Sequence, residues 1–148
     1  MNRSQRGFSL IELLIVVAII LIIAAIAIPN LLKSRIAANE ASAVSSMHAI
    51  ITAEITYSTI SSPSGFSPTL NALGPGQGDY IDANLAGGQK SGYNFTYAPI
   101  GVAPYPAYTF NVDPIIRSVT GQRSFYTDQT NVMRYNTGAV AGPNDPPL

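Results

Sequence analysis

The sequence of 148 residues contains no cysteine and few charged residues. The missing cysteine excludes disulfide bonds and structural sites in which thiolates hold zinc or iron–sulfur clusters. Eight basic residues balance eight acidic ones, so the charge gives no reason to expect a nucleic-acid partner. The length allows one domain, whose stability must come from packing. The apolar residues are concentrated near the N-terminus.

A long apolar run lies close to the N-terminus. Residues 8–28 are apolar except for Ser9 and Glu12. As a helix with a rise of about 1.5 Å per residue, they would span roughly 30 Å of hydrocarbon. The only charged side chains before the run are Arg3 and Arg6, so the positive-inside bias keeps this end cytoplasmic and exports the residues after Ile28. A cleaved secretory signal fits less well, because the run continues into a further helical pattern.

The pattern over residues 29–60 predicts an amphipathic continuation of the same helix. Apolar residues recur there at spacings of three, four, seven or eight, with polar residues between them. Pro29 has no amide hydrogen, so a bend or local break is expected at this position. The expected apolar stripe consists of Leu32, Ile36, Val44, Met47, Ile51 and Ile55, and the expected polar positions include Lys33, Arg35, Asn39, Glu40 and Glu54.

The rest of the chain is typical of a small sheet preceded by a loop. Residues 61–92 are rich in Gly, Pro, Ser and Asn and are expected to form a long connecting loop. Residues 93–137 predict an antiparallel sheet of three or four strands, and the Pro- and Gly-rich tail 138–148 is expected on the surface. The fold class is therefore α+β, with the long helix packed on the sheet. The expected strands are 93–97, 107–112, 123–127 and 132–135, with a turn at 128–131.

The run from Gly7 to Ile20, GFSLIELLIVVAII, resembles the N-terminal signature of type IV pilins and of the related pseudopilins of type II secretion. The resemblance implies that a prepilin peptidase removes residues 1–7 as a leader by cutting between Gly7 and Phe8. Phe8 would then be methylated on its amine. Glu12 would be the fifth residue of the mature chain, which the family needs for methylation and assembly. Pro29 falls where many pilins have a proline.

The sequence departs from the family pattern at two places. Leu21 stands where many members have a glycine that loosens the helix near the proline. The C-terminal cysteine pair that closes a disulfide loop in many pilins is missing. The C-terminal region must therefore be held in another way.

A carboxylate within an apolar helix needs a partner. Placing Glu12 in a membrane costs roughly 2.5–3.5 kcal/mol on insertion scales. Cleavage after Gly7 would create a positive partner, because the new amine of Phe8 is protonated at neutral pH. We expect the Phe8 amine of an incoming subunit to pair with Glu12 of a subunit already in the filament, where a mispaired register would strand both charges.

Other candidate sites have weaker support. His48 lies in the expected amphipathic helix without a catalytic partner nearby, so a surface or packing role is favoured. Asp79 with Asp82, or Asp113 with Asp128, could hold calcium, but neither pair has a recognisable ligand spacing. Residues 94–96 match a short glycosylation pattern that is common by chance. No cofactor, metal or enzymatic activity is expected.

The function that these residues favour is structural. The resemblance implies a pilin that is held in the inner membrane by one helix, with its C-terminal domain outside the cytoplasm, and that then polymerises into a helical surface filament. The implied partners are other copies of the chain, a prepilin peptidase with methyltransferase activity, and an assembly machine of the inner membrane. One alternative is a pseudopilin of a type II secretion system, and another is a membrane-anchored binding module.

Overall fold

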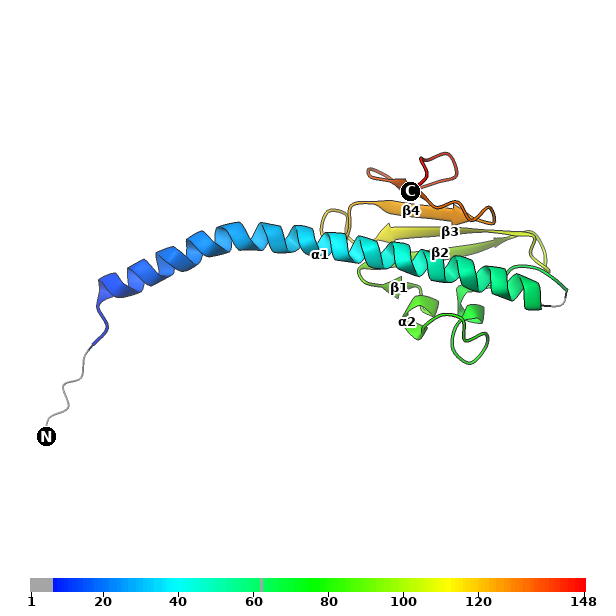
Figure 1. Cartoon of the computed structure of the whole chain (residues 1–148), viewed down its shortest axis with the longest axis horizontal. Coiled ribbons are helices and arrows are strands. Elements are labelled where there is room, and N and C mark those ends of the chain that lie inside the picture. Colours follow the sequence, from blue (N-terminus) through cyan, green and yellow to red (C-terminus); the bar gives the residue numbers. More distant parts are fainter. Residues whose placement is uncertain (1–6, 62) are drawn as a thin grey trace, which may run out of the picture. The chain divides into compact units, whose positions relative to one another are not determined.

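The computed structural model describes residues 7–61 and 63–148 and divides the chain into two compact units. The first unit ends at Ser34, and the second runs from Arg35 to Leu148. The helix α1 (Leu10–Ile60) contributes to both (Figure 1). The predicted helix over 8–28 and its continuation over 29–60 are therefore one element.

The part of α1 in the first unit is apolar and exposed. From Leu10 to Ile28, a range that the structure describes completely, no side chain is buried. Helical backbone continues through Pro29, which lies inside α1. The expected local break is thus not present, and the bend at Pro29 stays a prediction.

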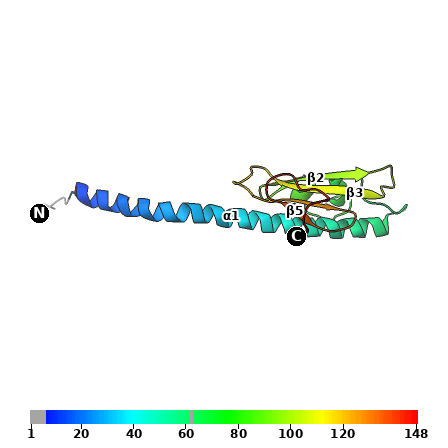
Figure 2. The ribbon, with the colours of Figure 1, turned by 90° about the horizontal axis from the view of Figure 1, so that it is seen from above.

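The second unit packs an antiparallel sheet against residues 35–60 of α1 (Figure 2). The strand order is β1-β2-β3-β4-β5, so each strand pairs with its neighbours in the sequence. The helix and the sheet together give the α+β fold predicted from the sequence. The strands are β1 (Gln89–Lys90), β2 (Tyr93–Ile100), β3 (Ala107–Pro114), β4 (Ser124–Asp128) and β5 (Arg134–Asn136).

The sheet has five strands, where three or four were expected. All four expected strands are present, and the additional strand β1 lies in the segment predicted as loop. Ser91 and Gly92 form the two-residue turn between β1 and β2, and both have positive φ, at 49° and 76°. This is the conformation that a type I′ hairpin turn requires. A strand of two residues is too short to give an alternating pattern.

The core lies between α1 and the sheet. The helix contributes Ala43, Met47 and Ile50, which are almost completely buried. Of the predicted stripe, Met47 and Ile51 are buried and Val44 is partly buried, whereas Leu32 and Ile55 are exposed. Leu32 belongs to the first unit, outside this core. The sheet contributes mainly aromatic side chains to the core: Tyr93, Phe95, Tyr108, Phe110 and Phe125.

The segment between α1 and the sheet is more regular than predicted. It contains the short helices η1 (Leu70–Leu73) and α2 (Ala83–Ala86). Thr69 caps η1 by accepting a hydrogen bond from the amide of Ala72, and Asp82 caps α2 in the same manner. Leu73 and Leu85 are buried in the core. This region therefore covers part of the core instead of forming an open loop.

Arginine–carbonyl hydrogen bonds hold the C-terminal region, which has no disulfide. The guanidinium of Arg117 donates to the carbonyl oxygens of Gln122, Thr137 and Ala139 at 2.7–3.2 Å, and to Oγ of Ser124 at 2.8 Å. A second set of contacts ties the tail to the edge strand β5. These contacts are Arg134 to the Asp145 carbonyl, Leu148 to the Met133 carbonyl, and Tyr135 to the Pro146 carbonyl.

Candidate functional site

The first candidate site is the segment that leads into α1. Gly7, Phe8 and Ser9 are exposed and non-helical, and the Phe8 side chain is 77% exposed. A Cβ atom added at Gly7 would meet nothing within 4 Å. The fold therefore gives no packing reason for a glycine at this position. Both residues that flank the Gly7–Phe8 peptide bond are exposed.

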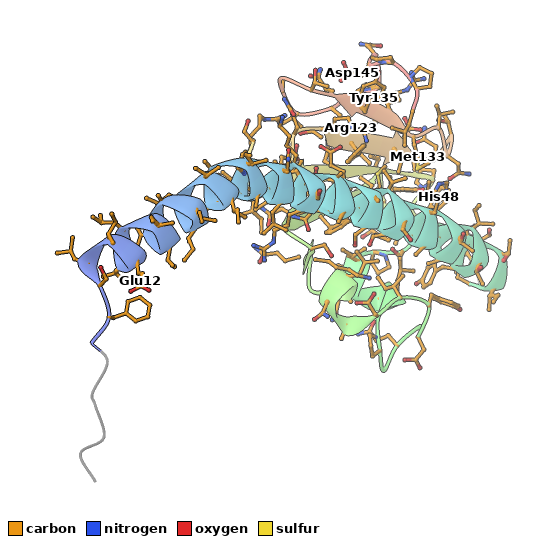
Figure 3. The ribbon with its side chains drawn as sticks, turned by 60° about the vertical axis from the view of Figure 1, so that its left-hand side comes forward. Glu12, His48, Arg123, Met133, Tyr135 and Asp145 are labelled. Atoms are coloured by element: carbon orange, nitrogen blue, oxygen red, sulfur yellow. The ribbon has the colours of Figure 1, made fainter. Side chains whose placement is uncertain are left out.

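The carboxylate of Glu12 caps the start of α1. Its Oε2 atom accepts a hydrogen bond from the Ser9 amide at 3.0 Å, and the Ser9 carbonyl accepts one from Leu13 at 3.3 Å. These bonds make Ser9 the N-cap residue and Glu12 the third helical residue, and the bond from the Ser9 amide to Glu12 is one half of a capping box. A negative charge is also favourable near the positive end of the helix dipole. Figure 3 labels Glu12 at this end of α1.

The capping role of Glu12 was missed in the sequence analysis, although a signal for it is present. Serine followed three residues later by glutamate, just before an apolar run, is the usual mark of a helix start. Glu12 therefore already has a partner within its own chain before any subunit joins it. Its predicted pairing with Phe8 of another subunit involves a second chain and stays a prediction.

The helix after this segment has the length and composition of a membrane span. Among the described residues, α1 is the one helix long and apolar enough to cross a bilayer. Its apolar stretch begins at Leu10, directly after the N-cap residue Ser9. The carboxylate of Glu12 is therefore the one charge within an exposed apolar surface that runs from Leu10 to Ile28.

Two further glutamates of α1, Glu40 and Glu54, tie the helix to the rest of the second unit. Oε1 of Glu40 accepts the amides of Gln122 and Arg123 at 2.9 and 3.0 Å, and its Oε2 accepts Nε of Arg123 at 2.8 Å. Burial raises the pKa of Glu40, but these bonds together outweigh burial and leave the pKa below its ordinary value of 4.5.

Arg123 links Glu40 to the aromatic part of the sheet. Its guanidinium carbon lies 5.4 Å from the ring centre of Phe125 and 5.7 Å from that of Tyr135. Figure 3 labels Arg123 and Tyr135. Both distances are within the range of cation–π attraction. The ion pair and the two rings connect α1 with strands β4 and β5.

Glu54 is completely buried and bonded to the segment after α1. Its carboxylate accepts hydrogen bonds from the amide and the hydroxyl of Ser67. Glu40 and Glu54 were predicted as polar positions between apolar ones, which was wrong for their burial. Both lie seven residues from Met47, and residues seven apart share a helix face. That spacing was the available signal.

The remaining candidates do not converge on a site. His48 is exposed on α1. Asp82 caps α2, and its pKa is lowered chiefly by the hydrogen bond from Lys90. Asp128 accepts the amide and hydroxyl of Thr130. Over residues 7–61 and 63–148, no three His, Asp or Glu side chains are grouped to hold a metal ion. The two aspartate pairs considered for calcium thus include residues used in local capping.

Comparisons with known proteins match parts of the chain to an N-terminal motif and to two type IV pilus proteins. A family model described as "Prokaryotic N-terminal methylation motif" matches residues 2–28. "Type IV major pilin protein PilA" of Myxococcus xanthus is 43% identical over 74 residues, which cover 45% of this chain and 34% of the relative. "Type IV wide pilus major component PilA4" of Thermus thermophilus is 63% identical over 38 residues, which cover 26% of this chain and 29% of the relative.

These matches cover part of each protein. The chain spans about a third of the length of the two curated relatives. No solved structure matches the chain significantly.

Proposed function

Because this chain is a member of the type IV pilin family by its N-terminal methylation motif and its pilin relatives, we propose that it is a structural subunit of a type IV pilus. In this proposal the subunit is anchored in the inner membrane by α1 and then polymerises through the same helix. It catalyses no reaction itself.

The observation that carries the proposal is the exposed apolar part of α1 with a single carboxylate in its first turn. From Leu10 to Ile28 every side chain except that of the half-buried Ala24 is exposed to solvent in the isolated chain. An apolar surface of this size is unfavourable in water and requires lipid or other apolar surfaces to cover it. A membrane covers it before assembly, and the α1 helices of neighbouring subunits cover it in the filament.

Processing would turn the segment before α1 into the assembly site. The bond between Gly7 and Phe8 is exposed and non-helical, which suits cleavage by a prepilin peptidase. Cleavage leaves a protonated amine on Phe8, and the same enzyme or an associated methyltransferase then methylates it. The amine lies next to Ser9, whose amide donates to Glu12.

Glu12 would then select the register of each incoming subunit. In the apolar filament core, an amine and a carboxylate at the same depth attract strongly, whereas a shifted subunit leaves both charges without a partner. The pair therefore contributes more to correct registration than to net stability. An assembly machine of the inner membrane would supply the work needed to extract each subunit from the membrane.

Glu12 variants test this proposal. Glu12→Gln keeps an oxygen that can accept the Ser9 amide but loses the charge, and Glu12→Ala loses both. We expect either variant to accumulate in the membrane while sheared filaments fall at least about tenfold, the loss that corresponds to about 1.4 kcal/mol. Ser9→Ala is the matched control, since the hydrogen bond to Glu12 comes from its backbone. Normal filament yield with Glu12→Gln would contradict the proposed role.

A pseudopilin of type II secretion is the alternative that shares this processing. Both relatives, which are named as a major pilin and a major pilus component, favour the pilin. A pseudopilin would build short periplasmic filaments, so the length and abundance of surface filaments separate the two functions.

A further inference from the structure

The second unit exposes apolar side chains in two places. The first is the apolar loop, which we define as Ile115, Ile116 and Val119 in the connection between β3 and β4. These side chains are 46%, 55% and 48% exposed. The second is the aromatic groove, an open hollow of about 350 Å³ between the end of α1 and the connection from β2 to β3. The residues that line it include Tyr57, Phe66, Pro68, Ala103, Pro104 and Tyr105.

The apolar loop is held in one conformation by its own hydrogen bonds. The carbonyl of Ile116 accepts the amides of Val119 and Thr120 at 3.1 and 2.9 Å, and the Thr120 hydroxyl accepts the Ile116 amide at 3.1 Å. The Thr120 carbonyl accepts Nδ2 of Asn39 at 2.8 Å, which fixes the loop to α1. A loop ordered in advance loses little conformational entropy on binding.

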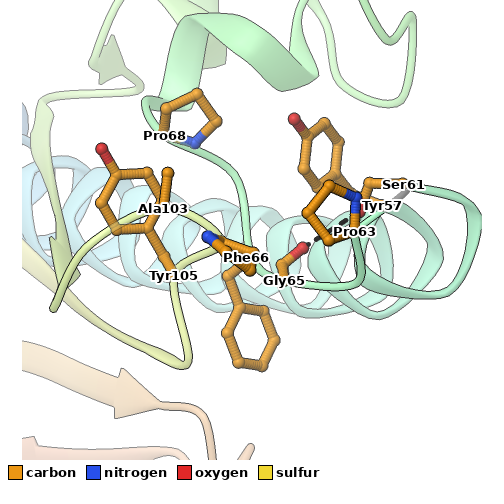
Figure 4. A pocket seen from close by; sticks show the side chains of 9 residues that line it. Tyr57, Ser61, Pro63, Gly65, Phe66, Pro68, Ala103 and Tyr105 are labelled. Carbon is orange, nitrogen blue, oxygen red and sulfur yellow. Dashed lines mark hydrogen bonds between the residues drawn. The ribbon is translucent and has the colours of Figure 1, made fainter.

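A backbone hydrogen bond also fixes the aromatic groove. The amide of Phe66 donates to the Tyr105 carbonyl at 2.9 Å, which joins the two segments that form the walls. Figure 4 shows Tyr57 and Tyr105 on either side of the groove, with Pro68 between them. None of the described residues that line it is charged. Val102, directly beside Ala103, is 84% exposed and extends the apolar surface.

The two surfaces lie at opposite ends of the sheet. Ile100 pairs with Ala107 at the end of the β2–β3 hairpin that leads to the groove, and Tyr93 pairs with Pro114 at the end that leads to the apolar loop. Eight residues of β3 lie between these ends, and at about 3.3 Å per residue they span roughly 25 Å. The apolar loop of one chain therefore cannot reach the groove of the same chain.

We propose that the apolar loop of one subunit occupies the aromatic groove of the next subunit in the filament. This inference rests on the proposed function. A helical filament joins two different surfaces of identical subunits, and these surfaces must be complementary. A knob at one end and a hollow at the other, both apolar, satisfy that requirement. Arg117, the charged residue within the loop, directs its guanidinium at acceptors of its own chain.

Cross-linking tests the contact directly, because the chain has no native cysteine. The variant Ala103→Cys with Ile116→Cys carries one thiol in the groove and one on the loop. Treatment of sheared filaments with a short bismaleimide should give a ladder of covalent multimers. Each single variant should give monomers only. The same double variant as a monomer in detergent should give no ladder, since the two thiols are at opposite ends.

A second double variant controls for random collisions. Ala98→Cys with Ile116→Cys moves the first thiol to an exposed position within β2, outside the groove. We expect no ladder from it. A ladder equal to that of the groove variant would overturn the proposed contact, and so would filaments of the groove variant that stay uncross-linked. If the unsubstituted chain formed no filament, the proposed function itself would fail, so the two failures are distinguishable.

A charge substitution provides the second measurement. Ile116→Glu should reduce filament yield about tenfold or more, because a carboxylate would be buried in a groove that offers no cation. Val132→Glu is the matched control, since Val132 is 38% exposed and belongs to neither surface. Processing and thermal unfolding of both variants should match those of the unsubstituted chain. Normal filament yield with Ile116→Glu would overturn the inference.

Discussion

The carboxylate of Glu54 accepts both the amide and the hydroxyl of Ser67, and all three groups are buried beneath the start of the connection from α1 to the sheet. The Ser67 carbonyl in turn accepts the Tyr97 hydroxyl at 2.8 Å. A helix residue, a connecting residue and a strand residue are thereby joined in one buried polar network. Its position next to the aromatic groove means that it also fixes one wall of that groove.

Removal of Glu54 should destabilise the second unit strongly. Glu54→Ala leaves the Ser67 amide and hydroxyl buried without their acceptor, which should lower the free energy of unfolding by roughly 3 kcal/mol. Ser67→Ala keeps the amide contact and should cost about 1 kcal/mol. Chemical denaturation of the full chain in detergent, followed by circular dichroism, measures both. Equal losses for the two variants would contradict the dominant role of the carboxylate.

Glu40 should make stability depend on pH in the acidic range. Its pKa in the folded chain lies below the ordinary value of 4.5, so its stabilising effect is present above that value and is lost as the pH falls through the lower folded pKa. Glu40→Gln should therefore unfold at a lower temperature than the unsubstituted chain at pH 7, and the difference should shrink toward pH 3. A difference that stays constant between pH 7 and pH 3 would argue against this ion pair as the cause.

Arg117 should replace a disulfide as the clamp on the C-terminal region. Arg117→Ala removes four hydrogen bonds and should cost roughly 2–3 kcal/mol. Hydrogen exchange should accelerate first over residues 137–139, because Thr137 and Ala139 supply two of the acceptors. Arg35→Ala is the matched control, because Arg35 is exposed on α1. If exchange over 137–139 is unchanged in Arg117→Ala, the clamp is not formed by this residue.

Gly7 should matter for processing and not for folding. A side chain at this position meets open space, so Gly7→Glu should leave thermal unfolding unchanged. The uncut chain should then remain in the membrane with Met1 at its N-terminus, as intact mass would show. Ser9→Ala tests whether any change in this exposed segment has the same effect. Normal cleavage of the Gly7→Glu chain would show that Gly7 is not part of the recognition site.

The sequence predicted the order of the elements well because the sheet is built from local hairpins. Each strand pairs with its neighbour in sequence, so turn residues and short β-rich runs were sufficient to find β2 to β5. Burial on α1 was harder to predict. Glu40 and Glu54 face the core because backbone amides of distant segments satisfy their carboxylates, and those partners are 13 to 83 residues away.

The N-terminal site could be predicted from the sequence, whereas the aromatic groove and the apolar loop could not. Gly7, Phe8 and Glu12 are parts of one motif, so a single stretch was enough to single them out. The aromatic groove combines residues near 57, 66 and 104, which only the folded chain brings together. The sequence does not show that the isoleucines of the apolar loop are exposed, because isoleucine is ordinarily predicted to be buried in a core.

The most direct test of the proposed function is the mass and N-terminus of the main component of filaments sheared from the cell surface. The expected component is this chain, beginning at Phe8 with a methylated amine and lacking residues 1–7. The chain with Met1 intact in the membrane, and absent from the filaments, would contradict it.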